Sequence, residues 1–401
     1  MRLLRVNTVY PQYANIFYQR NQHLLNANYF EQKNAYEQDF FSWAGSWEHI
    51  LNKNGYEARE IVINMLPMQA RWAAENGLPM SVSNQDIALA QIQAFRPDIL
   101  WYDVVDYELL QRIKSECPSI RLVMGWVGSA ITNNKQWGSM DVVLSCAPES
   151  VEILRDKGIA AEHLHHAFDP MVNSFLRSGN NKSGLSFIGQ IIRGKQFHYE
   201  REKMLLKLSS KVNLQIFSPS AELTWKEDIK TVLKKGAYQF AQVIKKIYSE
   251  DENLKKIPKF GKVFGWEEYP QFPLNYKLKS CLKNPVFGLD MFQTIQDSSM
   301  TLNIHADTSP KYASNMRLFE TTGVGTCLIT DWKDNLMDLF EPDKEVIVYK
   351  SVDECIDKVN WLIEHPEEIN KIAIAGQKRC LKEHTFENRA PILHRIIKKY
   401  L

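Results

Sequence analysis

Residues 301–331 read TLNIHADTSPKYASNMRLFETTGVGTCLITD. The segment opens with a short apolar run, passes through a polar loop into a short helical stretch, turns at two glycines and closes with a second apolar run. This order predicts a strand, a loop, a helix, a tight turn and a second strand. Two strands joined by a helix in this way normally lie parallel in one sheet. The segment therefore predicts a βαβ unit.

The same alternation of apolar runs and helical patterns extends from this segment in both directions. In the first part of the chain, strands are expected at Leu3–Val9, Glu60–Asn64, Asp98–Asp103, Arg121–Val127, Asp141–Cys146 and Glu162–Phe168. In the second part they are expected at Leu185–Gly189, Asn213–Ser218, Thr301–His305, Cys327–Asp331 and Glu345–Tyr349. Between the two parts, residues 169–184 (DPMVNSFLRSGNNKSG) break the pattern with Pro, Gly, Ser and Asn. The chain is thus predicted to be α/β, with two Rossmann-like doubly wound domains that face each other across a cleft.

Four parts follow from this division. An N-terminal domain spans residues 1–168, a linker 169–184, a C-terminal domain 185–387, and a final amphipathic helix 388–401. A helical insertion of about residues 219–285 interrupts the second domain, and between Lys226 and Lys262 it has ten lysines against five acidic residues. One interpretation is a solvated insertion. The other is a cationic surface that faces the cleft, the acceptor or an anionic membrane.

Composition excludes several classes of protein. The 401 residues include 49 basic and 47 acidic side chains, and a net charge of +2 argues against a nucleic-acid-binding protein. No apolar run approaches the ~20 residues of a membrane-spanning helix, and the N-terminus lacks the apolar core of a signal peptide. A cytoplasmic protein is expected, with any membrane contact peripheral and at the inner face. No two aspartates lie two positions apart, so neither a metal-held diphosphate site nor another cofactor is predicted.

The polar residues of the 301–331 segment suit a phosphorylated ligand. A helix that opens near Asn315 offers free backbone N–H groups to an anion such as a pyrophosphate. Arg317 adds a fixed positive charge, and the carboxylate of Glu320 can accept two hydrogen bonds from a ribose diol. Gly323 and Gly325 allow the backbone to approach a ligand closely. The alternative is an ordinary βαβ unit with a capped helix and a glycine turn.

These residues carry a resemblance to a known family. The stretch from Asn315 to Glu320 (NMRLFE), the turn Gly323-Val324-Gly325, and the tail that includes Gly376-Gln377, His384-Thr385 and Arg389 resemble the spore-protein CgeB-like glycosyltransferases. These belong to the GT-B glycosyltransferases with a family-1 type C-terminal domain. The resemblance implies a GT-B fold, a nucleotide-activated sugar as co-substrate, and a final helix that crosses back to the N-terminal domain. It places Glu320 at the nucleotide ribose and Arg317 at the donor phosphates. Tyr312 stands where the commoner pattern has a second glutamate, eight positions before Glu320.

A second donor-binding segment is expected where the pattern restarts after the linker. Gly189 ends the strand, and Gln190, Arg193 and Lys195 follow it with cations that suit a diphosphate. The alternative for Gly189 is that it only eases helix–sheet packing. The complete predicted donor site comprises Gly189, Gln190, Arg193, Lys195, His305, Asn315, Met316, Arg317, Glu320, Thr321 and Gly323.

Catalytic groups are expected on both domains. Arg317 would stabilise the departing diphosphate, and an inverting enzyme would also need a general base near the acceptor. Asp103, Asp106 and His166 are the candidate bases because each follows a predicted strand or lies near the domain boundary. The stereochemistry, inverting or retaining, stays open.

The predicted function is transfer of a sugar from a nucleotide sugar to a hydroxyl of a glycan, glycolipid or protein, in cell-surface glycan biosynthesis. Two alternatives remain: a non-catalytic carbohydrate- or nucleotide-binding surface-assembly protein, and a GT-B type nucleotide-sugar epimerase. The predicted donor site depends on Arg317 and Glu320 both contacting the donor. A buried ion pair between these two side chains would leave neither charge available to it.

Overall fold

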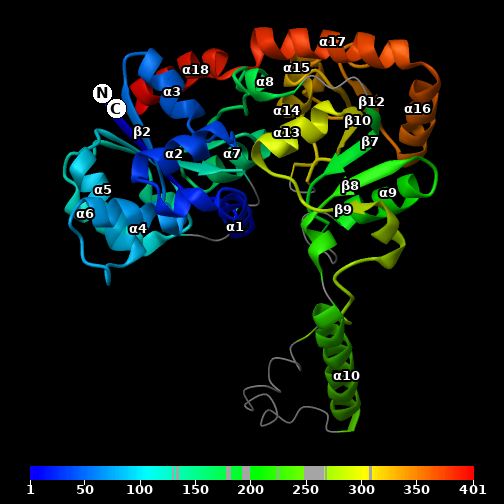
Figure 1. Ribbon diagram of the computed structural model, residues 1–401, viewed down its shortest axis with the longest axis horizontal. Coiled ribbons are helices and arrows are strands. Elements are labelled where there is room, and N and C mark those ends of the chain that lie inside the picture. Colours follow the sequence, from blue (N-terminus) through cyan, green and yellow to red (C-terminus); the bar gives the residue numbers. More distant parts are fainter. Residues whose placement is uncertain are drawn as a thin grey trace.

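The computed structural model describes residues 1–128, 131, 135–177, 182–191, 199–223, 225–247, 266, 269–306 and 309–401. In these residues two parallel six-stranded sheets lie side by side, each flanked by helices (Figure 1). The strand orders are β2-β1-β3-β4-β5-β6 and β12-β11-β10-β7-β8-β9, with parallel pairing along both sheets. The predicted fold class is confirmed.

The N-terminal domain contains the first sheet. Its strands are β1 (Arg2–Asn7), β2 (Glu57–Val62), β3 (Ile99–Asp103), β4 (Leu122–Val127), β5 (Val142–Ser145) and β6 (Ala161–His163). Its helices are α1 (Pro11–Arg20), α2 (Tyr29–Gln38), α3 (Ser46–Lys53), α4 (Leu66–Glu75), α5 (Asn84–Phe95), α6 (Tyr107–Glu116) and α7 (Pro148–Asp156). Alternate residues of β1 point to opposite faces, so Leu4 and Val6 join one apolar cluster and Leu3 joins another. Both faces of the sheet are therefore buried, as parallel sheets require.

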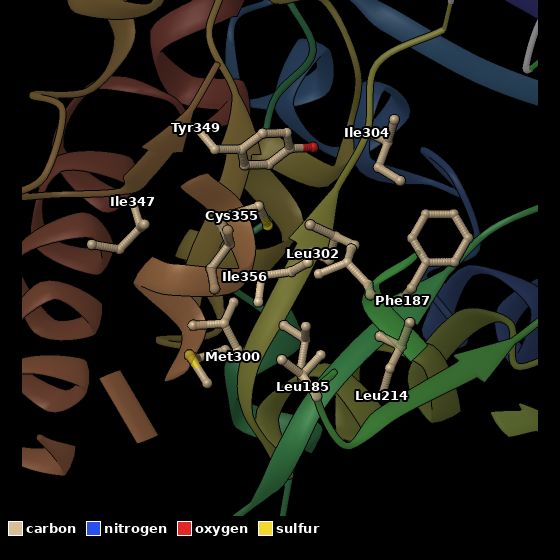
Figure 2. Packing of buried hydrophobic residues seen from close by; sticks show 14 of the residues in the cluster. Leu185, Phe187, Leu214, Met300, Leu302, Ile304, Ile347, Tyr349, Cys355 and Ile356 are labelled. Atoms are coloured by element: carbon tan, nitrogen blue, oxygen red, sulfur yellow. The ribbon is translucent and has the colours of Figure 1, made fainter. Parts of the chain in front are cut away.

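The C-terminal domain contains the second sheet. Its strands are β7 (Ser183–Ile188), β8 (Leu214–Phe217), β9 (Leu282–Lys283), β10 (Ser298–Asn303), β11 (Cys327–Asp331) and β12 (Ile347–Tyr349). The helices are α8 (Val172–Phe175), which precedes the sheet, α9 (Tyr199–Ser209), α10 (Trp225–Ile247), α13 (Gly288–Gln296), α14 (Arg317–Gly323), α15 (Leu336–Leu339), α16 (Val352–Glu364), α17 (Pro366–Glu383) and α18 (Phe386–Tyr400). Figure 2 shows the core on one face of this sheet, where side chains of β7, β8, β10 and β12 meet Cys355 and Ile356 of α16.

The last helix leaves the C-terminal domain and packs on the N-terminal one. Phe386 and Leu393 of α18 are buried in the cluster that also contains Trp47 of α3. The rings of Trp47 and Phe386 lie 5.1 Å apart, edge to face, and the hydroxyl of Tyr56 lies 2.7 Å from Nδ1 of His394. The predicted return of the C-terminal helix to the first domain is thus confirmed (Figure 1).

Several glycines of the tail and turn motifs have a packing role. A Cβ on Gly323 would lie 2.3 Å from Cγ of Phe168, and one on Gly376 would lie 2.3 Å from the carbonyl oxygen of Glu345. Contacts this short cannot be relieved without displacing the neighbour. These glycines therefore let α14 approach Phe168 and let α17 approach the backbone just before β12.

None of the described helices is both long enough and apolar enough to cross a membrane.

Candidate functional site

A cavity of about 670 Å³ lies between the two domains. Its lining comes from both: Arg5, Tyr10, Ser42, Trp43, Asp103, Trp126, Gly128, Ala147, Ser150 and His166 on the N-terminal side, and Gln190, Arg201, Ala306, Ser309, Ser314, Asn315 and Met316 on the C-terminal side. Many of these residues stand at or just after the carboxyl ends of strands. That edge is where open parallel sheets bind ligands.

Arg5 organises the charges of the N-terminal wall. It lies inside β1 and is almost fully buried, with ion pairs of 2.7 Å to Glu60 of β2 and 2.9 Å to Asp103 at the end of β3. Its guanidinium also lies 5.0 Å from the ring centre of Trp43. The Asp103 side chain is 24% exposed, so its carboxyl group is held by Arg5 on one side and reaches the cavity on the other. Burial raises the pKa of Asp103, and the positive charge of Arg5 opposes that rise.

His166 contributes a neutral imidazole to the same wall. Its ring packs against Trp43 and Trp126 at centroid distances of 5.2 and 5.5 Å. Burial, together with the positive charge of Arg389, lowers the pKa of His166 to about 3. Within the described part of the chain its Nδ1 atom is buried and has no hydrogen-bond partner. The structure therefore places an uncharged, unsatisfied polar atom beside the cavity.

Asn315 is the polar centre of the C-terminal wall. Its amide donates a hydrogen bond of 2.6 Å to Oδ1 of Asn303, whose own amide donates to Thr330 at 2.9 Å. These bonds fix the side chain, and among the described residues the buried Oδ1 atom of Asn315 has no partner. Arg201 adds a positive charge to this wall: it is 9% exposed and donates to the carbonyl oxygens of Gln190 at 3.0 Å and Ile304 at 2.8 Å.

The loop before α14 is held by the opposite domain. Glu149, near the start of α7, accepts hydrogen bonds of 3.0 Å from the backbone N–H groups of Lys311 and Tyr312. It also accepts one of 3.2 Å from the hydroxyl of Ser309. Two backbone donors on one carboxylate form strong, charge-assisted bonds. Glu149 therefore ties the two walls of the cavity together.

Arg317 and Glu320 are engaged with each other. Nη1 of Arg317 lies 2.9 Å from Oε2 of Glu320, and the two side chains are 16% and 8% exposed. Burial raises the pKa of Glu320, and the charge of Arg317 works against the rise. Neither residue lines the cavity, and Glu320 lies instead in a small adjoining crevice with Met316 and Phe168. The two charges therefore face each other and lie off the cavity lining.

The other predicted residues divide between the cavity and the core. Asp103, His166, Gln190, Asn315 and Met316 line the cavity. Asp106 does not, because its carboxylate caps α6 through the N–H of Leu109. Arg193 and Lys195 lie outside the described residues.

Four further donor-site candidates pack in the interior or beside it. His305 is buried, with Nδ1 2.7 Å from Asp331, and Thr321 is fully buried in α14. Gly323 faces Phe168, and Gly189 lies next to the Phe187 ring. None of the four lines the cavity.

Sequence reasoning missed three residues that build the site: Arg5, Glu60 and Glu149. Arg5 left a readable signal, since it is a charged residue between the apolar Leu4 and Val6, and such residues are almost never buried unless paired. Glu60 left a weaker one, because its strand also contains Glu57 and Arg59. Glu149 left none, because its partners lie about 160 positions away in the chain.

No metal site is evident in the part of the chain that the structure describes. Among the described residues, no three His, Cys, Asp or Glu side chains lie together so that they could hold one ion.

Comparison with known proteins extends these findings. The family described as "Glycosyl transferase-like" matches residues 239–395, and no curated protein sequence matches the chain. Similar solved structures include HepE of Anabaena in complex with UDP-glucose, with 11% identity, a TM-score of 0.52 and coverage of 99% of this chain and 100% of that one. Sucrose-phosphate synthase of Thermosynechococcus elongatus has 8% identity, a TM-score of 0.51 and coverage of 100% and 98%.

A glycosyltransferase of Rickettsia africae is similar over the same extent, with 8% identity, a TM-score of 0.52 and coverage of 100% of this chain and 98% of that chain. At such identities the likeness concerns the fold. The chain therefore has the two-domain GT-B glycosyltransferase fold, and its residues 239–395 match a glycosyl transferase-like domain.

Proposed function

We propose that this protein transfers a sugar from a nucleotide-sugar donor, bound on the C-terminal wall of the cavity, to an acceptor hydroxyl on the N-terminal wall. The observation that carries the proposal is the cavity itself: about 670 Å³ between two parallel sheets, with a buried arginine on each wall. The nucleotide-sugar donor is supported by HepE, which has this fold and was solved with UDP-glucose.

On the C-terminal wall, Arg201 and Asn315 are the proposed donor contacts. When the bond between sugar and diphosphate breaks, negative charge grows on the phosphate oxygens, and a fixed guanidinium in a poorly hydrated site stabilises that charge. The unpartnered Oδ1 of Asn315 can accept a hydrogen bond from a ribose or sugar hydroxyl. A donor role for Arg317 and Glu320 requires that the incoming nucleotide opens their 2.9 Å ion pair.

On the N-terminal wall, Asp103 is the proposed general base. In an inverting transfer it takes the proton of the acceptor hydroxyl while the oxygen attacks the anomeric carbon and the nucleotide diphosphate leaves. Arg5 holds the carboxyl group in place at 2.9 Å. His166 lines the same wall but is a weak base, since its pKa lies near 3; a hydrogen bond to the acceptor is the role that suits it better.

The proposal extends to features that follow from the motif resemblance and the charge pattern. They are a CgeB-like subfamily, a glycan, glycolipid or protein acceptor in cell-surface glycan synthesis, and a cytoplasmic site of action. Catalysis without a divalent ion is also proposed, because Arg201 supplies positive charge on the donor wall. Transfer should therefore continue at an unchanged rate in the presence of EDTA.

The test is incubation of the purified chain with UDP-, GDP-, CMP- and dTDP-sugars, followed by product analysis. Slow release of the unchanged sugar from one donor supports a transferase. Conversion of the sugar to its epimer would show an epimerase, and tight binding without turnover a binding protein.

The Arg317–Glu320 pair is tested in the same assay with Glu320→Ala. A donor affinity equal to that of the unaltered protein would end the proposed ribose contact of Glu320. Glu341→Ala, a change of an exposed glutamate far from the cavity lining, serves as the control.

A further inference from the structure

Helix α10 (Trp225–Ile247) differs from every other helix labelled in Figure 1 in where it lies. It extends as a rod away from both sheets and from the cavity between them. Its 23 residues make it about 35 Å long at 1.5 Å per residue. The helix thus projects from the C-terminal domain (Figure 1).

One side of this helix exposes large apolar side chains. Trp225, Ile229, Val232, Leu233 and Val243 are 66%, 48%, 56%, 68% and 53% exposed. At about 100° per residue these positions fall in a stripe about 100° wide, the pattern of an amphipathic helix. We call these five residues the α10 stripe.

Three contacts between α10 and later residues of the chain lie on a different side of the helix. Tyr238 packs edge to face on Tyr269 at 5.6 Å, and the ammonium of Lys235 lies 3.8 Å from the ring centre of Phe272. Asp228 accepts a hydrogen bond from the hydroxyl of Tyr276. None of these three contacts involves a residue of the stripe.

The charges of α10 indicate what the stripe binds. Residues 225–247 include six lysines and two acidic residues, a net charge of +4. Lys226, Lys230 and Lys234 follow one another along one flank of the stripe at helical spacing. A basic amphipathic helix with tryptophan and aliphatic residues on its apolar face is suited to the surface of an anionic bilayer. Each lysine near such a surface adds attraction to the anionic lipid headgroups.

Pairing with a second copy of the chain is less suitable. A coiled-coil seam from Trp225 and Ile229 would continue through positions 232, 236, 239 and 243, where Gly236 and Gln239 interrupt the apolar ladder. Two copies would also bring two strongly basic helices together, and like charges repel.

We propose that the α10 stripe is a membrane-docking surface that inserts into the headgroup region of an anionic bilayer, with its lysines on the lipid phosphates. The inference does not depend on the proposed transfer reaction. It places the protein at the surface of a membrane.

The experiment is co-sedimentation of the full chain with vesicles of phosphatidylcholine alone and with vesicles in which about a third of the lipid is phosphatidylglycerol. Binding to the anionic vesicles is expected to be at least about tenfold stronger and to weaken with salt. The variant Ile229→Ser/Leu233→Ser should lose that binding. The control is Ile363→Ser/Ile374→Ser, on α16 and α17, whose parent side chains are 50% and 68% exposed and so match the 48% and 68% of the stripe pair.

Three results would overturn the proposal. The first is equal binding to both kinds of vesicle, and the second is an equal loss of vesicle binding in the stripe variant and the control variant. The third is a dimer that the stripe variant dissociates although it still binds vesicles, which would mean that the stripe binds a second copy of the chain. Donor turnover is measured alongside in vesicle-free solution, where both double variants should match the unaltered chain. Loss of vesicle binding with intact turnover thus separates this inference from the proposed function.

Discussion

Replacement of Asp103 by asparagine separates the chemical role of this side chain from its structural one. The carboxyl group is one of two partners of the buried Arg5, at 2.9 Å, and Glu60 is the other, at 2.7 Å. Asparagine keeps the shape and one oxygen that can accept the guanidinium hydrogen bond, but it cannot take up a proton at neutral pH.

The structure sets the size of both effects. A neutral acceptor in place of the carboxylate weakens this hydrogen bond, so it costs no more than the about 1.5–3 kcal/mol of unfolding free energy of a bond to a charged group. That is less than the about 3–5 kcal/mol for a buried charge left with no partner, because Glu60 still pairs with Arg5. Loss of a general base costs about 10²–10⁴ in rate, or about 3–5.5 kcal/mol of activation free energy. The Asp103→Asn variant should therefore fold and bind the donor, yet transfer sugar at least about a hundredfold more slowly.

The assay follows sugar transfer, donor binding by calorimetry and urea unfolding in the same preparation. Asp106→Asn is the matched control: Asp106 caps α6 and lies off the cavity lining, and asparagine caps helices as well as aspartate does. Transfer by Asp103→Asn within about threefold of the unaltered rate would refute the assignment and favour a mechanism without a base at this position.

Three further outcomes are expected. Gly323→Ala places a Cβ 2.3 Å from the buried Phe168 ring, so it should lower the free energy of urea unfolding by about 1–3 kcal/mol. The control is Gly138→Ala, whose added Cβ meets no atom within 4 Å and which should change that free energy by less than about 0.5 kcal/mol. The pKa of His166 falls from 6.5 to about 3 on folding, so between these pH values the unfolded chain binds one more proton than the folded chain, and the unfolding free energy declines as pH drops from 6.5 toward 3. The variant His166→Gln should reduce that slope by up to about 1.4 kcal/mol per pH unit. An unchanged slope would contradict the lowered pKa. Glu149→Ala removes the acceptor of two backbone N–H groups and should speed amide hydrogen exchange in the loop before α14, with Glu152→Ala, an exposed glutamate on the same helix, as the control that leaves exchange unchanged.

Sequence reasoning worked best for the strands, where burial on both faces of a sheet determines both the apolar pattern in the sequence and the position of the strand. The strands were predictable because short apolar runs between helical patterns are what a sheet buried on both faces demands, and Cys327–Asp331 was placed to the residue. It was less accurate at ends: the strand expected over Glu162–Phe168 is only Ala161–His163. Beyond His163 the chain leaves the sheet toward the domain junction, where Phe168 pairs with Thr385 of the distant tail.

The site was only partly predictable. Asp103 could be placed at the cavity because it ends a strand, and Asn315 because it lies near the start of the helix that follows one; the carboxyl ends of parallel strands share one edge. The three-residue spacing of Arg317 and Glu320, which suggested a joint grip on the donor, equally well brings the two side chains together on one face of a helix, and the structure forms that contact at 2.9 Å.

The linear order of residues determined the α/β class and the two sheets, because burial periodicity and turn chemistry are local properties of the chain. The return of the last helix was expected from the motif resemblance to the GT-B glycosyltransferases and not from a local pattern. Only the tertiary structure decided which charges face the cavity and which neutralise each other. Glu60 follows Arg5 by 55 positions in the chain, and Asp103 follows it by 98. No local sequence pattern indicates contacts between residues so far apart. A charge acts through its distance and its exposure to water, and both are fixed only when the sheets have folded and the domains have met.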